Sequence, residues 1–165
     1  MAGPLEYLCY TDGSSKAVAG APGGWGYWIK PPAGPPLEGY GKARDTVSKA
    51  MEYRAVAEAL AALPDGASAA VFSDNQTMVE SLAKNLSAWR AGGFAKVDAV
   101  LLDSVKRIDD AITRRRLTVR WQWVRGHNGN EGNERADHLA GQGAREARAE
   151  VEAEEEAARR AKRRR

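Results

Sequence analysis

The chain has 165 residues, of which 43% are apolar, so it is long enough for one domain with a hydrophobic core and too short for two domains of ordinary size. Five Trp, five Tyr and two Phe residues exclude an intrinsically disordered chain, and the single cysteine excludes an internal disulfide. No apolar run is long enough to span a membrane, and the first residues carry no signal-peptide pattern. We therefore expect a cytoplasmic protein without a membrane partner.

The net charge of +3 is distributed unevenly. Residues 145–165 contain eight basic and six acidic side chains, which leaves 17 basic and 16 acidic side chains among residues 1–144. The larger part is therefore not strongly basic, and any contact with a polyanion must depend on local patches or metal ions. We predict one domain over residues 1–144 and a charged tail rich in Ala, Glu and Arg over 145–165. The four-apart pairs Glu155/Arg159 and Glu156/Arg160 favour a helical tail, with a frayed tail as the alternative.

Three strands are predicted in the first 46 residues. Alternation from Leu5 to Tyr10 predicts a strand, and the turn-forming sequence Asp12-Gly13-Ser14 comes next. We therefore expect the strand to end near Asp12, with its carboxylate at the edge of a sheet, where ligands of α/β proteins bind. Residues 23–30 and 37–46 predict two more strands on either side of a proline-rich turn, which gives an antiparallel meander.

A helix and a further strand follow the meander. Helical periodicity covers residues 48–63, with Ser48 expected as the N-cap and Glu52 near the first turn, where the helix dipole favours a carboxylate. Residues 67–73 form a short apolar strand suited to the middle of a sheet. Asp74 comes directly after this strand and, considered alone, is best explained as a helix cap.

Helices dominate the next forty residues. We predict one helix over residues 76–84 and two more over 86–90 and 96–115. The last of these carries an apolar stripe that should face the core. Its members are Val97, Val100, Leu101, Val105, Ile108 and Ile112. Alternating residues then predict a final strand over 117–124.

A Gly- and Asn-rich segment connects the final strand to a last helix. The segment begins at Arg125-Gly126-His127 and must be a loop. Asn133 or a neighbour is expected to cap the helix, which carries Asp137 about one turn from its start.

Four acidic residues fall in similar surroundings. Asp12 and Asp74 come at strand ends, whereas Glu52 and Asp137 lie early in helices. Carboxylates gathered in one place repel one another unless cations join them. Oxygen-only ligation suits magnesium or manganese, and the sequence has no Cys/His pattern for zinc. The four acids together therefore favour a divalent-metal site over four unrelated caps and turns.

Five segments of the chain match the pattern of a known family in the same order: Tyr-Thr-Asp-Gly-Ser at 10–14, Gly-Gly-Trp-Gly-Tyr at 23–27, Met-Glu at 51–52, Ser-Asp-Asn-Gln at 73–76, and Trp-Val-Arg-Gly-His through Asp137 at 123–137. Through them the sequence closely resembles ribonuclease H type 1 (RNase HI). The resemblance implies an α/β protein with the RNase H-like fold. Its five-stranded mixed sheet has three antiparallel strands followed by two parallel ones, and helices flank the sheet.

The resemblance also implies a function, the hydrolysis of the RNA strand of an RNA–DNA hybrid. Asp12, Glu52, Asp74 and Asp137 would hold two Mg²⁺ ions, or Mn²⁺, about 3.5–4 Å apart, which activate water and stabilise the leaving oxygen. The products would carry 5′-phosphate and 3′-hydroxyl ends. His127 matches a family histidine that shuttles protons or assists product release, and its unperturbed pKa near neutrality suits that work.

Seven positions match family residues that contact the substrate. Gly13, Ser14, Gln76 and Asn133 would face the RNA strand, and Thr46, Ser48 and Trp89 would face the DNA strand. Selection would depend on the 2′-hydroxyls, which only one strand of a hybrid carries.

The chain departs from the family pattern in three places. Gly20-Ala21-Pro22-Gly23 lacks a family asparagine, Ser48 replaces another, and residues 90–96 are shorter than the basic protrusion of some bacterial members. The basic end at 159–165 would replace that protrusion if it binds nucleic acid, although a charge run is usually only a solvated helix end.

Two alternatives differ from this hydrolase in class. One is a related DNA-cutting nuclease on the same fold, and the other is a catalytically silent module that only binds hybrids. The silent module is disfavoured, because clustered carboxylates beside phosphates weaken simple binding. We expect a monomer in either case.

Overall fold

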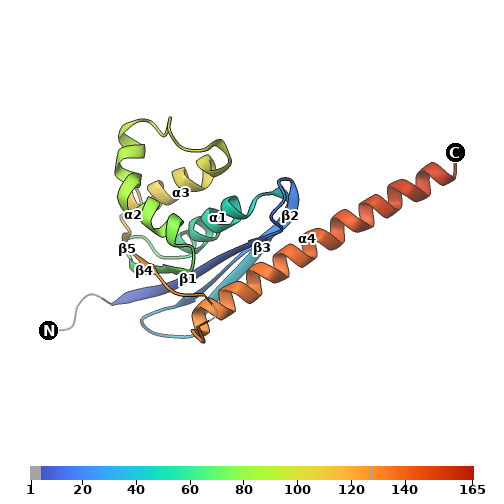
Figure 1. Cartoon of the computed structure of the whole chain (residues 1–165). Helices are drawn as coiled ribbons and strands as arrows, with labels where there is room; N and C mark the ends of the chain where they lie inside the picture. Colours follow the sequence, from blue (N-terminus) through green and yellow to red (C-terminus); the bar gives the residue numbers. More distant parts are fainter. Residues whose placement is uncertain (1–4, 127) are drawn as a thin grey trace.

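A five-stranded mixed sheet forms the centre of the computed structural model, which describes residues 5–126 and 128–165 (Figure 1). Its strands are β1 (Glu6–Ser15), β2 (Ala21–Lys30), β3 (Leu37–Thr46), β4 (Ser68–Ser73) and β5 (Thr118–Trp123). The spatial order is β3-β2-β1-β4-β5. The first three strands are antiparallel, and β4 and β5 run parallel to β1. This confirms the predicted fold class.

Helices pack on both faces of the sheet. They are α1 (Ser48–Ala61), α2 (Gln76–Ala91), the short 3₁₀ helix η1 (Ala99–Leu101), α3 (Leu102–Thr113) and α4 (Glu131–Arg163). Figure 1 shows α1, α2 and α3 on one side of the sheet, whereas α4 crosses the other side and continues beyond it. None of the helices in the described part of the chain is both long and apolar enough to cross a membrane.

The turn predicted at Asp12-Gly13-Ser14 is wrong, because β1 continues through it to Ser15. The partner strand β2 pairs with every residue of this stretch, from Asp12 opposite Gly26 to Ser15 opposite Gly23. A complete set of cross-strand partners thus overrides the turn preference of the Asp-Gly-Ser sequence. Asp12 consequently lies inside a strand and not at its end.

Several helix boundaries also differ from the prediction. The predicted helices over 76–84 and 86–90 form the single helix α2, which ends where Gly93 and Phe94 adopt left-handed backbone conformations. The next α-helix begins at Leu102 and not at residue 96, because Asp98 caps the short η1, its Oδ1 accepting the Val100 amide at 3.2 Å.

The predicted N-cap residues are displaced as well. Val47 is the N-cap of α1 and offers no side-chain hydrogen bond, so Ser48 is the first helical residue. The cap of α4 is Asn130, whose Oδ1 accepts the amide of Asn133 at 3.0 Å. The sequence predicts this cap at Asn133 itself or at a neighbouring residue.

The main core lies between the sheet and α1–α3. Its largest fully buried side chains include Ile29, Val56, Leu60, Met78, Leu82, Val105 and Ile108. Of the predicted apolar stripe, Leu101, Val105 and Ile108 are buried, and Val97 and Ile112 pack against them. Val100 is 55% exposed, because the tighter 3₁₀ turn at 99–101 rotates it away from the face that an α-helix would present.

Helix α4 lies in direct backbone contact with the sheet. A Cβ on Gly143 would lie 2.1 Å from the carbonyl oxygen of Gly41, and one on Gly24 would lie 2.4 Å from the carbonyl oxygen of Ala140. Neither oxygen belongs to a side chain that could rotate away. Glycine on both sides of the interface therefore sets how closely the helix approaches β2 and β3.

Substituting Gly143 tests this contact against a control in the same helix. We expect Gly143→Ala to lower the free energy of unfolding by about 1–3 kcal/mol, the usual range for overpacking. Gly141→Ala should be neutral or stabilise the protein by up to about 1 kcal/mol, because its Cβ would meet only the mobile end of Arg145. Urea unfolding followed by circular dichroism measures both, and equal stabilities would contradict the backbone contact.

Candidate active site

Three carboxylates from distant parts of the chain meet at one place. One oxygen from each of Asp12, Glu52 and Asp74 lies within 4.8 Å of the others. The parallel pairing of β1 and β4 explains how two of them meet. Tyr10 is opposite Phe72, so Asp12 and Asp74, each two residues further on, emerge side by side. Asp12 and Glu52 are only 5% and 8% exposed.

Gly13 brings α1 against β1 and so delivers Glu52 to the cluster. A Cβ at this position would lie 2.4 Å from the backbone nitrogen of Glu52, closer than any side chain permits. The Gly13 amide donates to Asp12 Oδ1 at 2.9 Å and to Glu52 Oε1 at 3.2 Å. The missing side chain of Gly13 therefore leaves room for α1, and the backbone amide of Gly13 donates hydrogen bonds to two carboxylates.

The electrostatics of the cluster favour protonation. Burial raises the pKa of Asp12, and the negative charges of Glu52 and Asp74 and hydrogen bonds to the carboxyl groups of Asp137 and Glu52 raise it further. Burial likewise raises the pKa of Glu52, against the opposing effect of its hydrogen bonds with Asp12 and the Gly13 amide. Glu52 Oε2 is buried and has no hydrogen-bond partner within the described residues. A bound cation would satisfy that oxygen and remove the repulsion.

Asp137 approaches the cluster from the opposite face of the sheet. It lies on α4, is exposed to solvent, and reaches Asp12 through the hydrogen bond between their carboxyl groups. The structure thus brings all four predicted acids to one region, three of them in a tight group and the fourth on its solvent side.

The loop after β5 covers one side of Asp74. A Cβ on Gly126 would lie 2.9 Å from Asp74 Oδ2, and the indole Nε1 of Trp123 donates to the backbone oxygen of Asp74 at 3.2 Å. Sequence reasoning gave Trp123 only a place in the final strand and gave Gly126 no role in the site. Both residues belong to the Trp-Val-Arg-Gly-His segment, and this is the feature of the sequence that could have identified them as part of the site. His127, which follows, lies outside the described residues.

The predicted substrate-contacting residues are spread around the cluster. Gly13 and Ser14 are half-buried on β1, Thr46 is half-buried at the end of β3, and Ser48 is exposed at the start of α1. Gln76 is exposed and donates to Glu80 Oε1 at 3.1 Å, whereas Asn133 is only 3% exposed. Trp89 is half-buried on α2.

A cleft begins beside Asp74 and contains Trp89. It has a volume of about 430 Å³ and is lined by residues of α1, α2 and the segment that leads into η1. Asn75, the residue after Asp74, is one of the lining residues, and Lys49, Lys96 and Asp98 are its charged side chains. The cleft therefore combines an aromatic surface with two cations and one carboxylate.

The family model for RNase H matches residues 5–145. A ribonuclease H of Polaromonas naphthalenivorans is 37% identical over 143 residues, which cover 85% of this chain and 88% of that protein. The crystal structure of LC9-RNase H1, a type 1 RNase H with the type 2 active-site motif, has a TM-score of 0.70 and 22% identity over 87% of this chain and 74% of that chain. A foamy viral protease-reverse transcriptase, solved in complex with an RNA/DNA hybrid, has a TM-score of 0.62 and 18% identity over 85% of this chain and 20% of that chain. The sequence resemblance is thus confirmed, and the chain belongs to the ribonuclease H family of endoribonucleases.

Proposed function

We propose that this protein is a metal-dependent endonuclease that hydrolyses the RNA strand of RNA–DNA hybrids and leaves 5′-phosphate and 3′-hydroxyl ends. The observation that carries the proposal is the group of three carboxylates within 4.8 Å in a chain of the ribonuclease H family. The hybrid bound to the foamy viral protein of the same fold supports the choice of substrate.

The residues present fit a pair of divalent cations. Asp12, Glu52, Asp74 and Asp137 offer only oxygen atoms, which suits Mg²⁺ or Mn²⁺. The buried and unpartnered Glu52 Oε2 is an oxygen that a cation would satisfy. Bound divalent cations supply Lewis-acid stabilisation of the phosphate charge and a nucleophilic water.

The protein's own part in catalysis is positioning and electrostatics. Burial of Asp12 and Glu52 gives their charges a low-dielectric environment, where they act more strongly than in water. The Gly13 amide fixes the orientation of both carboxylates before substrate arrives. Asp137 is exposed to solvent and would meet an approaching phosphate, and His127 would exchange a proton with solvent or product.

Substrate selection in this proposal divides between two surfaces. Gly13, Ser14, Gln76 and Asn133 would read the RNA strand and its 2′-hydroxyls. Trp89 and the two lysines of the cleft would hold the DNA strand, by sugar–aromatic packing and by charge. Thr46 and Ser48, between the end of β3 and the start of α1, would contact the DNA backbone.

We further propose that residues 1–144 contain the whole catalytic apparatus and that the protein acts as a cytoplasmic monomer. A hybrid-cleavage assay, run with duplex DNA in parallel and with and without Mg²⁺, tests the function. Metal-dependent cleavage of the hybrid supports it, cleavage of duplex DNA identifies a DNA nuclease, and binding without cleavage identifies a silent module.

Neutralising either strand-borne carboxylate should abolish cleavage. We expect Asp12→Asn and Asp74→Asn to lose hybrid cleavage at saturating Mg²⁺ while keeping the native circular dichroism spectrum, because each loses an anionic ligand without a change in shape. Asp110→Asn, an exposed position on α3, is the matched control and should retain full activity. Near-normal turnover of either cluster variant would refute the assigned roles.

The same Asp12→Asn substitution should stabilise the metal-free protein at pH 7. The pKa of Asp12 is higher in the folded protein than in the unfolded chain, so the folded protein holds the carboxyl proton more tightly. The free energy of unfolding therefore falls as the pH rises above about 4, the pKa of Asp12 in the unfolded chain. Asparagine removes this penalty, so we expect a gain of about 1–3 kcal/mol at pH 7 that vanishes near pH 4.

Thermal unfolding in a chelator across this pH range measures the effect. Added Mg²⁺ should raise the melting temperature of the unsubstituted protein more than that of the variant. A variant less stable than its parent at pH 7 would show that the cluster is not under repulsion.

Substituting His127 should slow the reaction without eliminating it. General acid–base catalysis contributes about 10²-fold or more, whereas the metals supply most of the transition-state stabilisation. We therefore expect His127→Ala to reduce the single-turnover rate by about that factor. A loss as complete as that of Asp12→Asn would assign this histidine a different role.

A further inference from the structure

The second half of α4 is attached to the edge strand β3 by a ladder of polar pairs. Tyr40 donates its hydroxyl to Glu146 Oε1 at 2.9 Å, Lys42 pairs with Glu150, and Arg44 pairs with Glu154. We call these three pairs the β3–α4 ladder. Figure 1 shows the helix crossing the sheet at this level and projecting past it.

The ladder is possible because two spacings match. The helix residues are four apart, which is about 6 Å at 1.5 Å per residue. The strand residues are two apart, which is about 6.6 Å at 3.3 Å per residue. Three successive pairs therefore stay in register, and Glu146, Glu150 and Glu154 are bound to β3. These three carboxylates consequently do not pair with the basic residues further along the helix.

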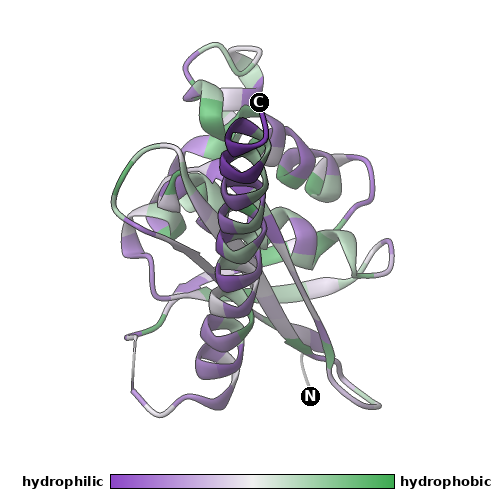
Figure 2. Ribbon diagram, turned by 90° about the vertical axis from the view of Figure 1, so that its right-hand side faces the viewer, coloured by the Kyte–Doolittle hydropathy of each residue, from purple (hydrophilic) through white to green (hydrophobic). Residues whose placement is uncertain are grey.

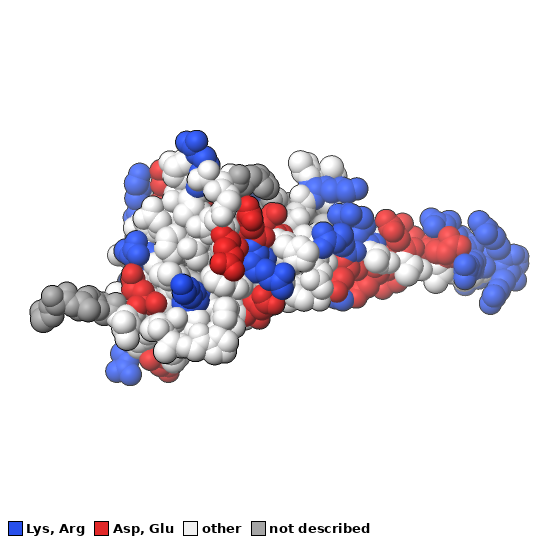
Figure 3. Space-filling model, turned by 90° about the horizontal axis from the view of Figure 1, so that it is seen from below, with Lys and Arg blue, Asp and Glu red and all other residues white. Residues whose placement is uncertain are grey.

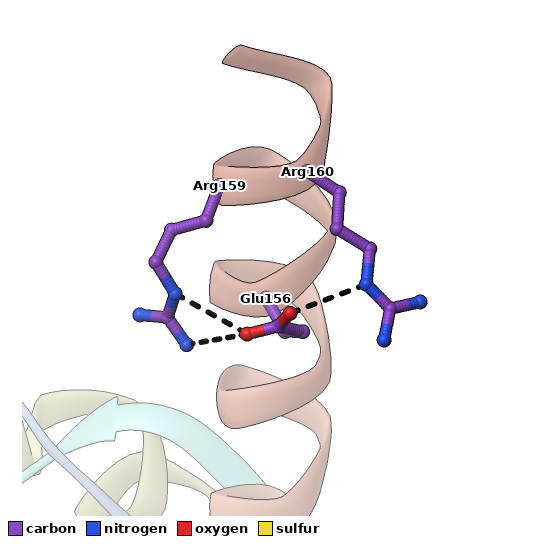
Figure 4. Close-up of polar contacts among 3 residues, drawn as sticks. All are labelled: Glu156, Arg159 and Arg160. Atoms are coloured by element: carbon purple, nitrogen blue, oxygen red, sulfur yellow. Dashed lines mark hydrogen bonds and ion pairs between the residues drawn. The ribbon is translucent and has the colours of Figure 1, made fainter. Parts of the chain in front are cut away.

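Beyond the ladder the helix carries a strongly basic end. Its six cations lie within residues 159–165, which we call the basic tip. Glu156 pairs with Arg159 at 3.0 Å and with Arg160 at 3.2 Å (Figure 4). The other four cations make no ion pair within the described residues. Figure 3 shows the positive side chains gathered at the end of the projecting helix.

The chemistry of this projecting segment favours a polyanion over a membrane or a helical partner. Figure 2, in which α4 runs up the picture to the C-terminus, shows mostly hydrophilic residues on the last turns. On one side of the last turns, the apolar residues are three alanines spaced four apart, Ala153, Ala157 and Ala161. Insertion into a bilayer surface or a coiled-coil seam requires larger apolar side chains. Binding by charge alone, through the release of counterions, is typical of nucleic-acid backbones.

We propose that the basic tip binds the sugar-phosphate backbone of the hybrid at a distance from the active site, and that the β3–α4 ladder holds it there. The inference rests on the proposed function, which supplies the nucleic acid. Arg163 is 26 residues after Asp137, or about 39 Å along the helix. This length corresponds to about 12 base pairs of duplex. Hybrids shorter than this cannot reach both sites, so the tip strengthens the binding of long hybrids only.

Neutralising the unpaired end of the tip tests the proposal. The triple variant Arg163→Gln, Arg164→Gln, Arg165→Gln leaves the pairs of Glu156 intact. We expect it to reduce the log–log salt slope of binding to a hybrid of about 24 base pairs by about 2–3, close to 0.9 for each lost contact. Binding is measured in the full-length chain with Asp12→Asn in both proteins, so that the hybrid is not cleaved.

The control neutralises the same number of charges on another surface. Lys106, Arg114 and Arg116 are exposed and make no ion pair within the described residues, and their Gln variants should leave the slope unchanged. With native Asp12, the tip variant should cleave hybrids of about 8 base pairs at the unaltered rate, because they are too short to reach the tip.

Two results would overturn the proposal. One is an unchanged slope for the tip variant on the long hybrid. The other is a tip that binds phosphatidylserine vesicles while contributing nothing to hybrid binding. Failure of the proposed function is a separate result, because the protein with native Asp12 and native tip would then not cleave the short hybrid.

Discussion

The repulsion among three clustered carboxylates, two of them buried, is the constraint on which the arrangement of this protein depends. Asp12, Glu52 and Asp74 have oxygens within 4.8 Å of one another, and the surroundings of Asp12 and Glu52 raise their pKa values instead of relieving the charge. A flexible scaffold would separate such groups. Here each is fixed by an element that the core holds in place, so the repulsion persists until a cation or a proton removes it.

Three features of the scaffold resist that separation. The parallel register of β1 and β4 sets two of the acids side by side. The missing side chain at Gly13 allows α1 to contact β1, and its amide is shared between two carboxylates. On the opposite face, glycines let α4 lie directly on β2 and β3, and this helix carries the fourth acid, Asp137. Both faces of the sheet therefore contribute to one site through unusually close packing.

The sequence predicted what depends on local pattern and on matched motifs. The strand at 37–46 has the predicted bounds, and three of the four acids that were expected to gather form a tight group. The strand end at Asp12 was predicted wrongly because local turn preference does not reveal that β2 pairs beyond it. Ser48 was predicted as a cap from its residue type, although the chain enters α1 one residue earlier.

The β3–α4 ladder could not be predicted from periodicity. Four-apart acids and bases within one helix suggest pairs inside that helix, and Glu156 with Arg160 is such a pair. Glu150 and Glu154 instead pair with strand residues more than 100 positions earlier. Only the crossing of α4 over β3 brings these charges together, and that crossing depends on glycine contacts that have no signature in a hydropathy pattern.

The wide spacing of the site residues also has a consequence for synthesis of the chain on the ribosome. Asp12, Glu52 and Asp74 belong to segments that emerge early, whereas α4, with Asp137, emerges after all five strands. Until then the face of β2 that carries Gly24 and Gly26 has no helix to cover it. Asp137 is 63 residues after Asp74, so at about 5–20 residues per second it is added several seconds later. A nascent chain therefore passes through a period in which only three of the four clustered acids are present, and the group is completed only once the start of α4 has been made.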